Sequence, residues 1–276
     1  MKSIMIQGTA SGAGKTTIVA ALCRILSNRG YSVAPFKSQN MSNYSYKDGF
    51  EISQAQAIQA IAARAQISPH MNPILLKPLG NYISDIIIQG KPYKKMSAKT
   101  YYERFALAKG LKIAMESFAY LKSKYDIIVL EGAGSPAEIN LQKYDIANMK
   151  MAQKTRSPVL LVTDIEKGGS FASLVGTMSL LPQSHRNLVK GFIINKFRGN
   201  AKLLQPGFRI LKQITSKSVL GVIPSVDLDL PNEDSLDNKI HLFKKQNKKK
   251  LDSQLDKLAS IVQKNLDVRS IERLIQ

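Results

Sequence analysis

Short runs of consecutive apolar residues recur along the chain, and between them apolar residues return every three or four positions. Continuous apolar runs are typical of strands buried on both faces of a parallel sheet, whereas the wider spacing is typical of amphipathic helices. The runs that we expect as strands are residues 4–6, 33–36, 86–88, 127–130, 159–162, 192–194 and 219–223. The stretches that we expect as helices are 53–65, 101–124, 170–181 and 207–215, with another over the apolar positions between 18 and 26. This alternation predicts an α/β fold with a doubly wound, mostly parallel sheet, which binds ligands at the carboxyl ends of its strands.

The pattern changes after residue 235, where the alternation of strands and helices stops. Residues 239–250 contain six Lys and no Asp or Glu, and such a run is typical of a solvated linker or surface. Beyond it, apolar residues at helical spacing predict an amphipathic helix, and they are Leu251, Leu255, Leu258, Ile261, Val262 and Leu266. We therefore divide the chain into an α/β domain over residues 1–235, a basic linker over 236–250 and a C-terminal amphipathic helix over 251–276. That helix is expected to dock on the body of the protein or to bind a partner.

The charge balance is the unusual feature of the composition. The chain has 276 residues, with 40 Lys and Arg against 20 Asp and Glu, and a formal net charge of +20. This charge favours a polyanionic partner, which is a nucleic acid, an acidic membrane surface or a small polyanionic substrate. The sequence has no zinc-ligand spacing and no RNA-binding signature, so a nucleic acid is not expected. No apolar run approaches the roughly 18 residues that a membrane span needs, so no membrane span is expected either.

Two features of the sequence predict a cytoplasmic protein. The N-terminus enters a strand directly, so we expect no signal peptide. The single cysteine, Cys23, excludes an internal disulfide, as is common in a reducing compartment. Its residue type and its place in a helix favour a small buried apolar side chain over a reactive thiol.

Residues 8–17, with the sequence GTASGAGKTT, follow the first apolar strand and precede a helix. This context predicts a phosphate-binding loop for ATP, in which backbone N–H groups cradle the phosphates, a Lys reaches the outer ones and a Thr hydroxyl ligates Mg²⁺. The expected nucleotide-binding residues of the loop are Gly12, Ala13, Gly14, Lys15, Thr16 and Thr17, and Thr16 is also an expected metal ligand. The usual spacing, G-x-x-x-x-G-K-[ST], would place a glycine at position 9, but this chain has Thr9 there and its glycine one residue earlier, at Gly8.

Acidic residues follow several of the expected strands or open the next helix. Glu131 ends the strand that starts at 127 and is expected to hold Mg²⁺ near a phosphate. Asp164 follows the next strand, where it either caps the following helix or contacts substrate or metal. Asp48 and Glu51 open another helix, and Asp48 is either its N-cap or, like Glu51, a further carboxylate on the metal side.

Two other polar residues follow expected strands. Lys37 lies close to the phosphate loop if the first two strands are near neighbours, and there it would stabilise a transferring phosphoryl group or the carboxylate that accepts it. The alternative is a surface Lys in a polar turn. Asn195 is suited to bind adenine, because its amide both donates and accepts hydrogen bonds. The three histidines show no pattern typical of catalysis or of a metal site.

The longer motifs together resemble those of the cobyric acid synthase family, ATP-dependent amide-forming enzymes of cobalamin biosynthesis. They occur in the family's order between residues 1 and about 235, and they are GTASGAGKTT (8–17), APFKSQNMSN (34–43), DGFEISQAQAIQA (48–60), MNPILLKP (71–78), YDIIVLEGAGSPAEINL (125–141), YDIANM (144–149), VTDIEKGGSFASLVGT (162–177), KGFIINKFRG (190–199) and LGVIP (220–224). The shifted glycine agrees with this resemblance, since dethiobiotin synthetase and its relatives carry it too. The resemblance implies a P-loop NTPase fold of the dethiobiotin synthetase type, with residues 1–235 as an ATP-dependent synthetase domain.

The resemblance also implies a reaction. ATP would phosphorylate peripheral carboxylates of adenosylcobyrinic acid a,c-diamide, and ammonia would displace phosphate from each acyl phosphate, giving cobyric acid. The catalytic residues expected on this basis are Lys15, Lys37, Glu131 and Asp164. The residues expected to line the substrate side are Ser38, Gln39 and Asn40, together with Asp164. A corrinoid polycarboxylate would also account for part of the positive charge.

The sequence departs from the family in one large respect. Members of the family usually continue into a glutamine amidotransferase domain, whose Cys nucleophile releases ammonia from glutamine. Here the one cysteine, Cys23, lies in the helix after the phosphate loop, so we expect nitrogen from free ammonia or from a separate glutaminase subunit, unless the activity is lost. The C-terminal helix is then a remnant of the interdomain region or the site of that partner, and a homodimer is left open.

Three alternatives are considered beside this interpretation. A nucleotide-switch ATPase of the chromosome-partitioning or cell-division type (ParA/MinD-like) would share the fold. Such proteins typically carry a second Lys near the start of the loop, where this chain has Ala10 and Ser11. An ATP-dependent synthetase for another carboxylic acid would keep the chemistry and change the pocket. A non-catalytic subunit is disfavoured because the loop residues and Glu131 are all present.

Overall fold

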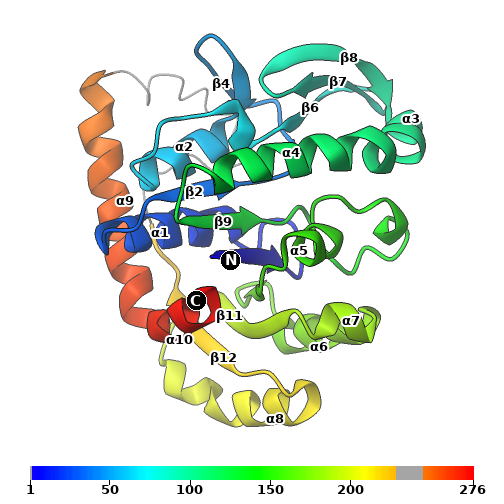
Figure 1. The fold of residues 1–276 in the computed structure, drawn as a ribbon. Coiled ribbons are helices and arrows are strands. Elements are labelled where there is room, and N and C mark those ends of the chain that lie inside the picture. Colours follow the sequence, from blue (N-terminus) through cyan, green and yellow to red (C-terminus); the bar gives the residue numbers. More distant parts are fainter. Residues whose placement is uncertain (1, 228–244) are drawn as a thin grey trace.

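The central feature of the fold is a six-stranded parallel sheet. The computed structural model describes residues 2–227 and 245–276, and Figure 1 shows the sheet crossing the middle of the molecule. Its strand order is β12-β11-β10-β1-β9-β2, and every neighbouring pair is parallel. The strands are β1 (Ser3–Gly8), β2 (Val33–Phe36), β9 (Ile127–Glu131), β10 (Val159–Asp164), β11 (Val189–Phe197) and β12 (Val219–Pro224). The prediction of a doubly wound, mostly parallel sheet is confirmed.

Helices cover both faces of this sheet (Figure 1). The longer ones are α1 (Lys15–Asn28), α2 (Gln54–Ala62), α4 (Leu111–Lys122), α5 (Met149–Thr155), α6 (Ser170–Leu180), α8 (Gln205–Thr215), α9 (Lys245–Asn265) and α10 (Val268–Ile275). Short turns of helix are α3 (Ala98–Thr100), α7 (Gln183–Arg186), η1 (Pro69–Met71), η3 (Gln142–Tyr144) and η4 (Ala201–Leu204). Along β1, Ile4 and Ile6 pack with α1 and α9, whereas Met5 packs with α4, α5 and α6. Both faces are therefore buried, which is why these strands are continuously apolar.

A second, four-stranded sheet begins where β2 ends. Its strands are β3 (Gln39–Met41), β6 (Ile74–Gly80), β7 (Ile83–Ile88) and β8 (Lys91–Ser97). β3 pairs with β6 in parallel, and β6, β7 and β8 are antiparallel. The expectation that residues 86–88 form a strand of the parallel sheet is therefore wrong. In β7, Ile86 packs with Met96 and with Phe105 of η2 (Tyr101–Gly110), and a three-residue apolar run does not distinguish such a strand from one in the parallel core.

Two helix caps that were considered as alternatives, at Asp48 and Asp164, are not formed. Residues 45–53 form a short antiparallel hairpin of β4 (Ser45–Lys47) and β5 (Glu51–Ser53), and Asp48 lies in its turn. The N-cap of α2 is Ser53, and that of α6 is Gly169, so neither Asp48 nor Asp164 caps the helix that follows it. Several polar residues and glycines precede each of these helices, and any of them is a reasonable N-cap by residue type.

The C-terminal segment docks on the central sheet as two helices, where one was expected. α9 runs along α1 and reaches β12 (Figure 1), and Leu255 and Leu258 are fully buried in the cluster that contains the apolar face of α1. Arg24 of α1 is also fully buried, and its guanidinium donates hydrogen bonds to Asp252 of α9 and to the carbonyl of Ile61. Of the expected linker over 236–250, residues 236–244 lie outside the described residues, and 245–250 form the start of α9.

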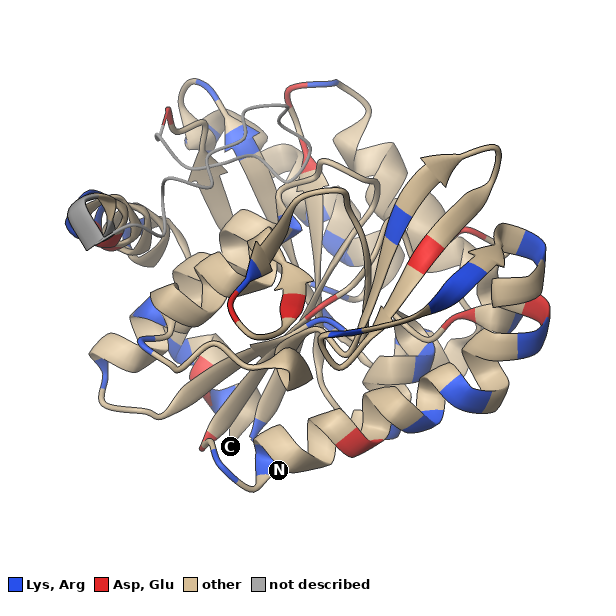
Figure 2. Ribbon diagram, turned by 90° about the horizontal axis from the view of Figure 1, so that it is seen from above, with Lys and Arg blue, Asp and Glu red and all other residues tan. Residues whose placement is uncertain are grey.

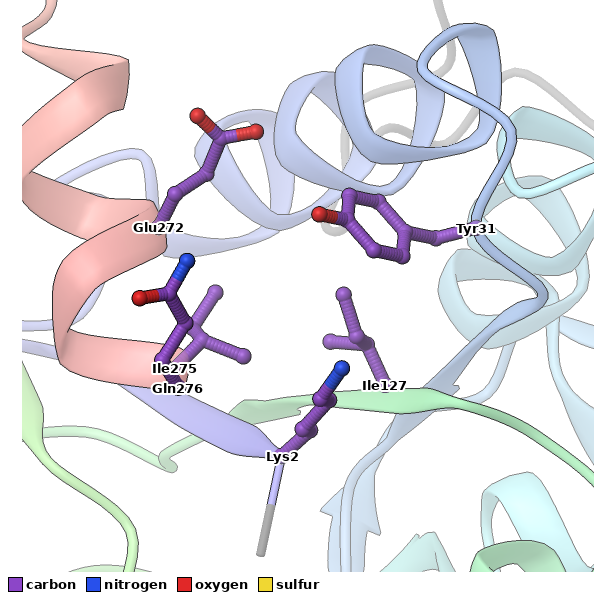
Figure 3. A pocket seen from close by; sticks show the side chains of 6 residues that line it. All are labelled: Lys2, Tyr31, Ile127, Glu272, Ile275 and Gln276. Carbon is purple, nitrogen blue, oxygen red and sulfur yellow. The ribbon is translucent and has the colours of Figure 1, made fainter.

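α10 ends beside the amino-terminal ends of β1 and β9. Figure 3 shows Glu272 and Ile275 of α10 and the following Gln276, which together with Lys2, Tyr31 and Ile127 of the body line a small hollow. The hollow between them has a volume of about 10 Å³, which is enough for about one water molecule. Glu272 also forms an ion pair with Arg29 at the end of α1. The hollow is therefore a small gap in the packing between α10 and the body, too small for a ligand larger than water.

The positive charge is distributed over the molecule. In Figure 2, Lys and Arg lie on most elements, and exposed ones on β8 include Lys91, Lys94 and Lys95. In the described ranges, 2–227 and 245–276, no helix is both long and apolar enough to cross a membrane.

Candidate active site

The phosphate loop joins the end of β1 to the start of α1. Gly14 directly precedes α1 with a φ of 95°, and Gly12 has a φ of 72°, in a region that other residues rarely adopt. A Cβ on Gly14 would also lie 1.9 Å from Nδ2 of Asn195. Glycine is therefore required at position 14. The N–H groups at the start of α1 have no partner within the helix, and such groups are typical binding sites for phosphate.

The position of Gly8 is explained by the path of Lys15. The Lys15 side chain turns back over the end of β1, and its Nζ donates hydrogen bonds to the carbonyls of Ala10 and Gly134, each at 2.9 Å. A Cβ on Gly8 would lie 3.0 Å from this Nζ and 3.1 Å from the Ala10 oxygen. Thr9 stands where the usual glycine would be, and its hydroxyl donates a hydrogen bond to a threonine of β10 at 3.1 Å. A side chain at position 8 would thus crowd the lysine, which favours glycine there.

Glu131 is the centre of a buried polar cluster at the carboxyl end of the sheet. Its Oε1 accepts hydrogen bonds from Oγ1 of Thr16 and from Nζ of Lys37, both at 2.8 Å. Glu131 and Lys37 are only 1% and 2% exposed, so Lys37 is not a surface residue. Thr16 follows β1 and Lys37 follows β2, and β9, which ends in Glu131, lies between these two strands. The sheet order therefore brings together three of the residues that the sequence singles out.

Sequence reasoning missed Gln59 of α2. Its Nε2 donates hydrogen bonds to Oε2 of Glu131 and, at 3.3 Å, to the main-chain oxygen of Thr16. The signal in the sequence was three glutamines, at positions 54, 56 and 59, in a helix that otherwise consists of Ala and Ile. Burial of amides costs free energy unless they find partners, so glutamines on such a helix indicate a polar cluster.

Asn148, which precedes α5, was also missed. Its side-chain amide binds both the N–H (3.1 Å) and the carbonyl (2.7 Å) of Ala133. A Cβ on Gly132 would lie 2.3 Å from Oδ1 of Asn148. Asn148 therefore fixes the loop that follows Glu131. In the same loop, the carbonyl of Gly134 accepts a hydrogen bond from Lys15 of the phosphate loop.

Three of the expected substrate-side residues lie at the start of the second sheet and are buried. Ser38 donates a hydrogen bond to the carbonyl of Ile146 at 2.7 Å. Gln39 accepts one from the Tyr101 hydroxyl at 2.7 Å, and burial raises the pKa of that phenol, which keeps it a donor. Asn40 binds side chains at the start of α2. All three side chains thus anchor the segment that leads out of the central sheet.

Asn195 and Asp164 lie on the other side of the phosphate loop, at the ends of β11 and β10. Asn195 donates a hydrogen bond from Nδ2 to the carbonyl of Ala13 at 3.0 Å. Lys196, which sequence reasoning missed, donates from Nζ to the carbonyl of Gly12 at 2.9 Å and to Oδ2 of Asp164 at 2.8 Å. The backbone of Lys196 is left-handed, with a φ of 59°. Asp164 therefore contacts the phosphate loop through Lys196.

Asp48 and Glu51 lie in the β4–β5 hairpin. The Tyr46 hydroxyl donates to Asp48 at 3.0 Å, and Lys77 and Ser45 donate to Glu51. Burial by itself raises the pKa of Glu51, but the hydrogen bonds from Lys77 and Ser45 outweigh it and hold that pKa below its ordinary value. Within the part of the chain that the structure describes, no three His, Cys, Asp or Glu side chains gather as a metal site.

Cys23 is fully buried on the core side of α1. Burial, with a smaller contribution from the charge of Glu131, raises the pKa of its thiol far above the ordinary value. A nucleophile must be a thiolate, so Cys23 has a structural role, as its residue type and position predicted.

Comparison with known proteins matches residues 4–236 to the CobQ/CobB/MinD/ParA nucleotide binding domain. The chain is 52% identical over 240 residues to a probable cobyric acid synthase of Thermococcus kodakarensis, a match that covers 85% of this chain and 49% of that protein. It is 52% identical over 233 residues to the cobyric acid synthase of a Thermoanaerobacter species, covering 84% and 46% of the two chains. A probable cobyric acid synthase of Methanosphaera stadtmanae is 50% identical over 251 residues, covering 90% and 50%. The resemblance inferred from the motifs is confirmed, and the chain spans about half the length of the curated relatives it matches.

Proposed function

Because this chain belongs to the CobQ/CobB/MinD/ParA nucleotide binding domain family, we propose that it uses ATP to convert peripheral carboxylates of a corrinoid into amides. The name of its relatives indicates cobyric acid as the product, and the substrate that we propose, from the resemblance of the motifs, is adenosylcobyrinic acid a,c-diamide. The observation that carries the proposal is the meeting of Thr16, Glu131 and Lys37 beside the phosphate loop. The hydroxyl of Thr16 and the carboxylate of Glu131 offer oxygen ligands for a cation. The buried ammonium of Lys37, which contacts the same carboxylate, offers a positive charge for an anion.

The residues present fit ATP and Mg²⁺. The left-handed backbone at Gly12 and Gly14 and the start of α1 provide the phosphate cradle. The Thr16 hydroxyl and the Glu131 carboxylate are hard oxygen donors, which Mg²⁺ prefers, and a small number of protein ligands is usual when phosphates and water supply the rest. When bound, Mg²⁺ neutralises charge on the phosphates. Whether Asp48 or Glu51 adds a ligand stays a prediction.

The chemistry requires two displacements. A carboxylate does not react with ammonia directly because oxide is a poor leaving group. In the first step a carboxylate oxygen attacks the γ-phosphorus and ADP leaves, giving an acyl phosphate. In the second step ammonia attacks the acyl carbon, phosphate leaves with that oxygen, and the nitrogen loses a proton. Catalysis then consists mainly of bringing two anions together and stabilising their charge.

We propose roles in these two steps for the lysines and polar residues of the site. Lys15 would hold the outer phosphates, and Lys37 would meet the γ-phosphate or the attacking carboxylate. Asp164 would act through its contact with Lys196 at the loop. We further propose that Asn195 binds adenine through its side-chain carbonyl oxygen while its Nδ2 stays on Ala13, and that the segment over 38–40 borders the substrate.

In this proposal the nitrogen reaches the site as ammonia, either free or released from glutamine by a glutaminase. The only cysteine of the sequence is Cys23, and its burial and raised pKa exclude it as the nucleophile of a glutaminase. With the chain alone, ammonium should therefore support the reaction and glutamine should not. Glutamine-dependent amidation by the purified chain would contradict this part of the proposal.

The decisive experiment supplies the chain with Mg-ATP, an ammonium salt and the corrinoid diamide, and follows ADP release and corrinoid mass. We expect ADP release that depends on the corrinoid and a stepwise mass change as each hydroxyl is replaced by an amino group. The Lys37→Met variant should lower turnover by about 100-fold and retain nucleotide binding through the loop. ATP-dependent dimerisation without any corrinoid effect would instead favour a nucleotide-switch ATPase and would refute the proposal.

A further inference from the structure

Three buried amide side chains connect the substrate side of the site to Glu131. Asn40 donates hydrogen bonds from Nδ2 to Oγ of Ser53 at 2.7 Å and to Oε1 of Gln56 at 3.2 Å. Gln56 donates from Nε2 to Oε1 of Gln59 at 3.4 Å, and Gln59 donates to Oε2 of Glu131. We call Asn40, Gln56 and Gln59 the amide chain. It begins in β3 and ends at the proposed metal ligand.

The direction of the amide chain is set by the charge of Glu131. If Gln59 were turned over, its carbonyl oxygen would face a carboxylate oxygen, which is repulsive. With its nitrogen on Glu131, Gln59 presents its carbonyl to Gln56, and Gln56 in turn presents its carbonyl to Asn40. Every amide therefore donates toward Glu131, Gln56 and Gln59 each accept from the amide before them, and Asn40 accepts from the N–H of Met41. These contacts restrict the rotation of each amide.

Gln59 has the contacts of a residue that fixes a metal site. Its Nε2 donates one hydrogen bond to Oε2 of Glu131 and another to the main-chain oxygen of Thr16. A single amide nitrogen thus bridges the two residues that offer oxygen ligands. Oε1 of Glu131 is the oxygen that faces the Thr16 hydroxyl. A hydrogen bond on Oε2 holds the carboxylate in that orientation. Partners of this kind commonly change metal affinity by about 10- to 100-fold when they are removed.

We propose that Gln59, oriented by Gln56 and Asn40, is a positioning residue that holds Glu131 ready to bind Mg²⁺ with the nucleotide. The inference rests on the proposed function only in that the site must bind Mg-nucleotide, and it does not depend on the corrinoid. The same helix offers a control. Gln54 is also buried, but its Nε2 has no hydrogen-bond partner in the described part of the chain.

The test measures binding of a fluorescent, non-hydrolysable ATP analogue to the full chain over a range of Mg²⁺ concentrations and in EDTA. Gln59→Met removes, at similar volume, the two hydrogen bonds that Gln59 donates and the one that it accepts from Gln56. It should raise the half-saturating Mg²⁺ concentration by about tenfold or more, with binding in EDTA unchanged. Gln56→Met leaves Gln59 in place and should give a smaller rise, which keeps the test valid if Gln59→Met does not fold. Gln54→Met should match the wild type.

Three results would overturn the inference. The first is an unchanged Mg²⁺ dependence of nucleotide binding in both Gln59→Met and Gln56→Met. The second is a loss of binding in EDTA as large as the loss in Mg²⁺, which would indicate damage to the phosphate loop. The third is a wild-type chain whose nucleotide binding does not depend on Mg²⁺. A wild-type chain that binds Mg-nucleotide but makes no amide would refute the proposed substrate and leave the role of Gln59 standing.

Discussion

Leu258 of α9 provides a test of whether the C-terminal helices belong to the cooperative fold. It is fully buried against the apolar face of α1, although the match to the nucleotide-binding family ends at residue 236. α1 begins at the phosphate loop, so α9 supports the helix on which the candidate site depends. We predict that Leu258→Ala destabilises the whole α/β domain and not α9 alone.

The magnitude follows from the burial of the side chain. Truncation of a fully buried Leu to Ala removes apolar contacts and leaves a cavity, which lowers the free energy of unfolding by about 3 kcal/mol, within a usual range of about 2–5 kcal/mol. For a domain of this size each kcal/mol lowers the melting temperature by about 2–4 °C, so the expected decrease is about 6–12 °C. Leu203 is 77% exposed, and Leu203→Ala is a matched control with an expected change within about 0.5 kcal/mol.

The assay compares two probes of thermal unfolding in the wild type and both variants. Far-ultraviolet circular dichroism reports helices and strands everywhere, and release of a bound fluorescent nucleotide reports the phosphate loop. If α9 belongs to the core, both midpoints fall together in Leu258→Ala. A separate early loss of helix with an unchanged nucleotide-release midpoint, or no change in either midpoint, would refute the reasoning.

Three further predictions concern single sites. Gly14→Ala should abolish nucleotide binding in an equilibrium titration, because the new Cβ would lie 1.9 Å from Nδ2 of Asn195 at a φ of 95°; normal affinity would contradict the loop geometry. Lys77→Met should raise the pKa of Glu51, measured by carboxyl NMR titration, because Lys77 is a main cause of its lowered value. Since the folded pKa of Glu51 is the lower one, its contribution to stability is present above the unfolded pKa of about 4.3 and is lost as pH falls through the folded value; an unchanged pKa in the variant would contradict this. Cys23 should react with a maleimide only at the rate of unfolding, because it is fully buried and its pKa is raised; rapid labelling of the native chain would contradict the packing of α1.

The contacts of the site show why some expectations hold and others fail. The phosphate loop and the position of Glu131 at the carboxyl end of its strand were predictable, because each depends on a few adjacent residues at the end of one strand. Asp48 and Asp164 were each assigned as an alternative N-cap, but Ser53 and Gly169 take those positions. Residue type alone does not select among neighbouring N-cap candidates, since the choice depends on where tertiary packing lets the helix begin.

The sequence by itself determined the fold class, the nucleotide loop and the kind of ligand that the loop binds, because these follow from local periodicity and from backbone positions that glycine occupies. Only the tertiary structure decided that β9 lies between β1 and β2, which places Glu131 between Thr16 and Lys37. It also decided that β7 belongs to a second sheet, and that Gln59 reaches Glu131 from α2. These outcomes depend on which distant segments pack together, and the free energy of that packing is not contained in any short stretch of sequence.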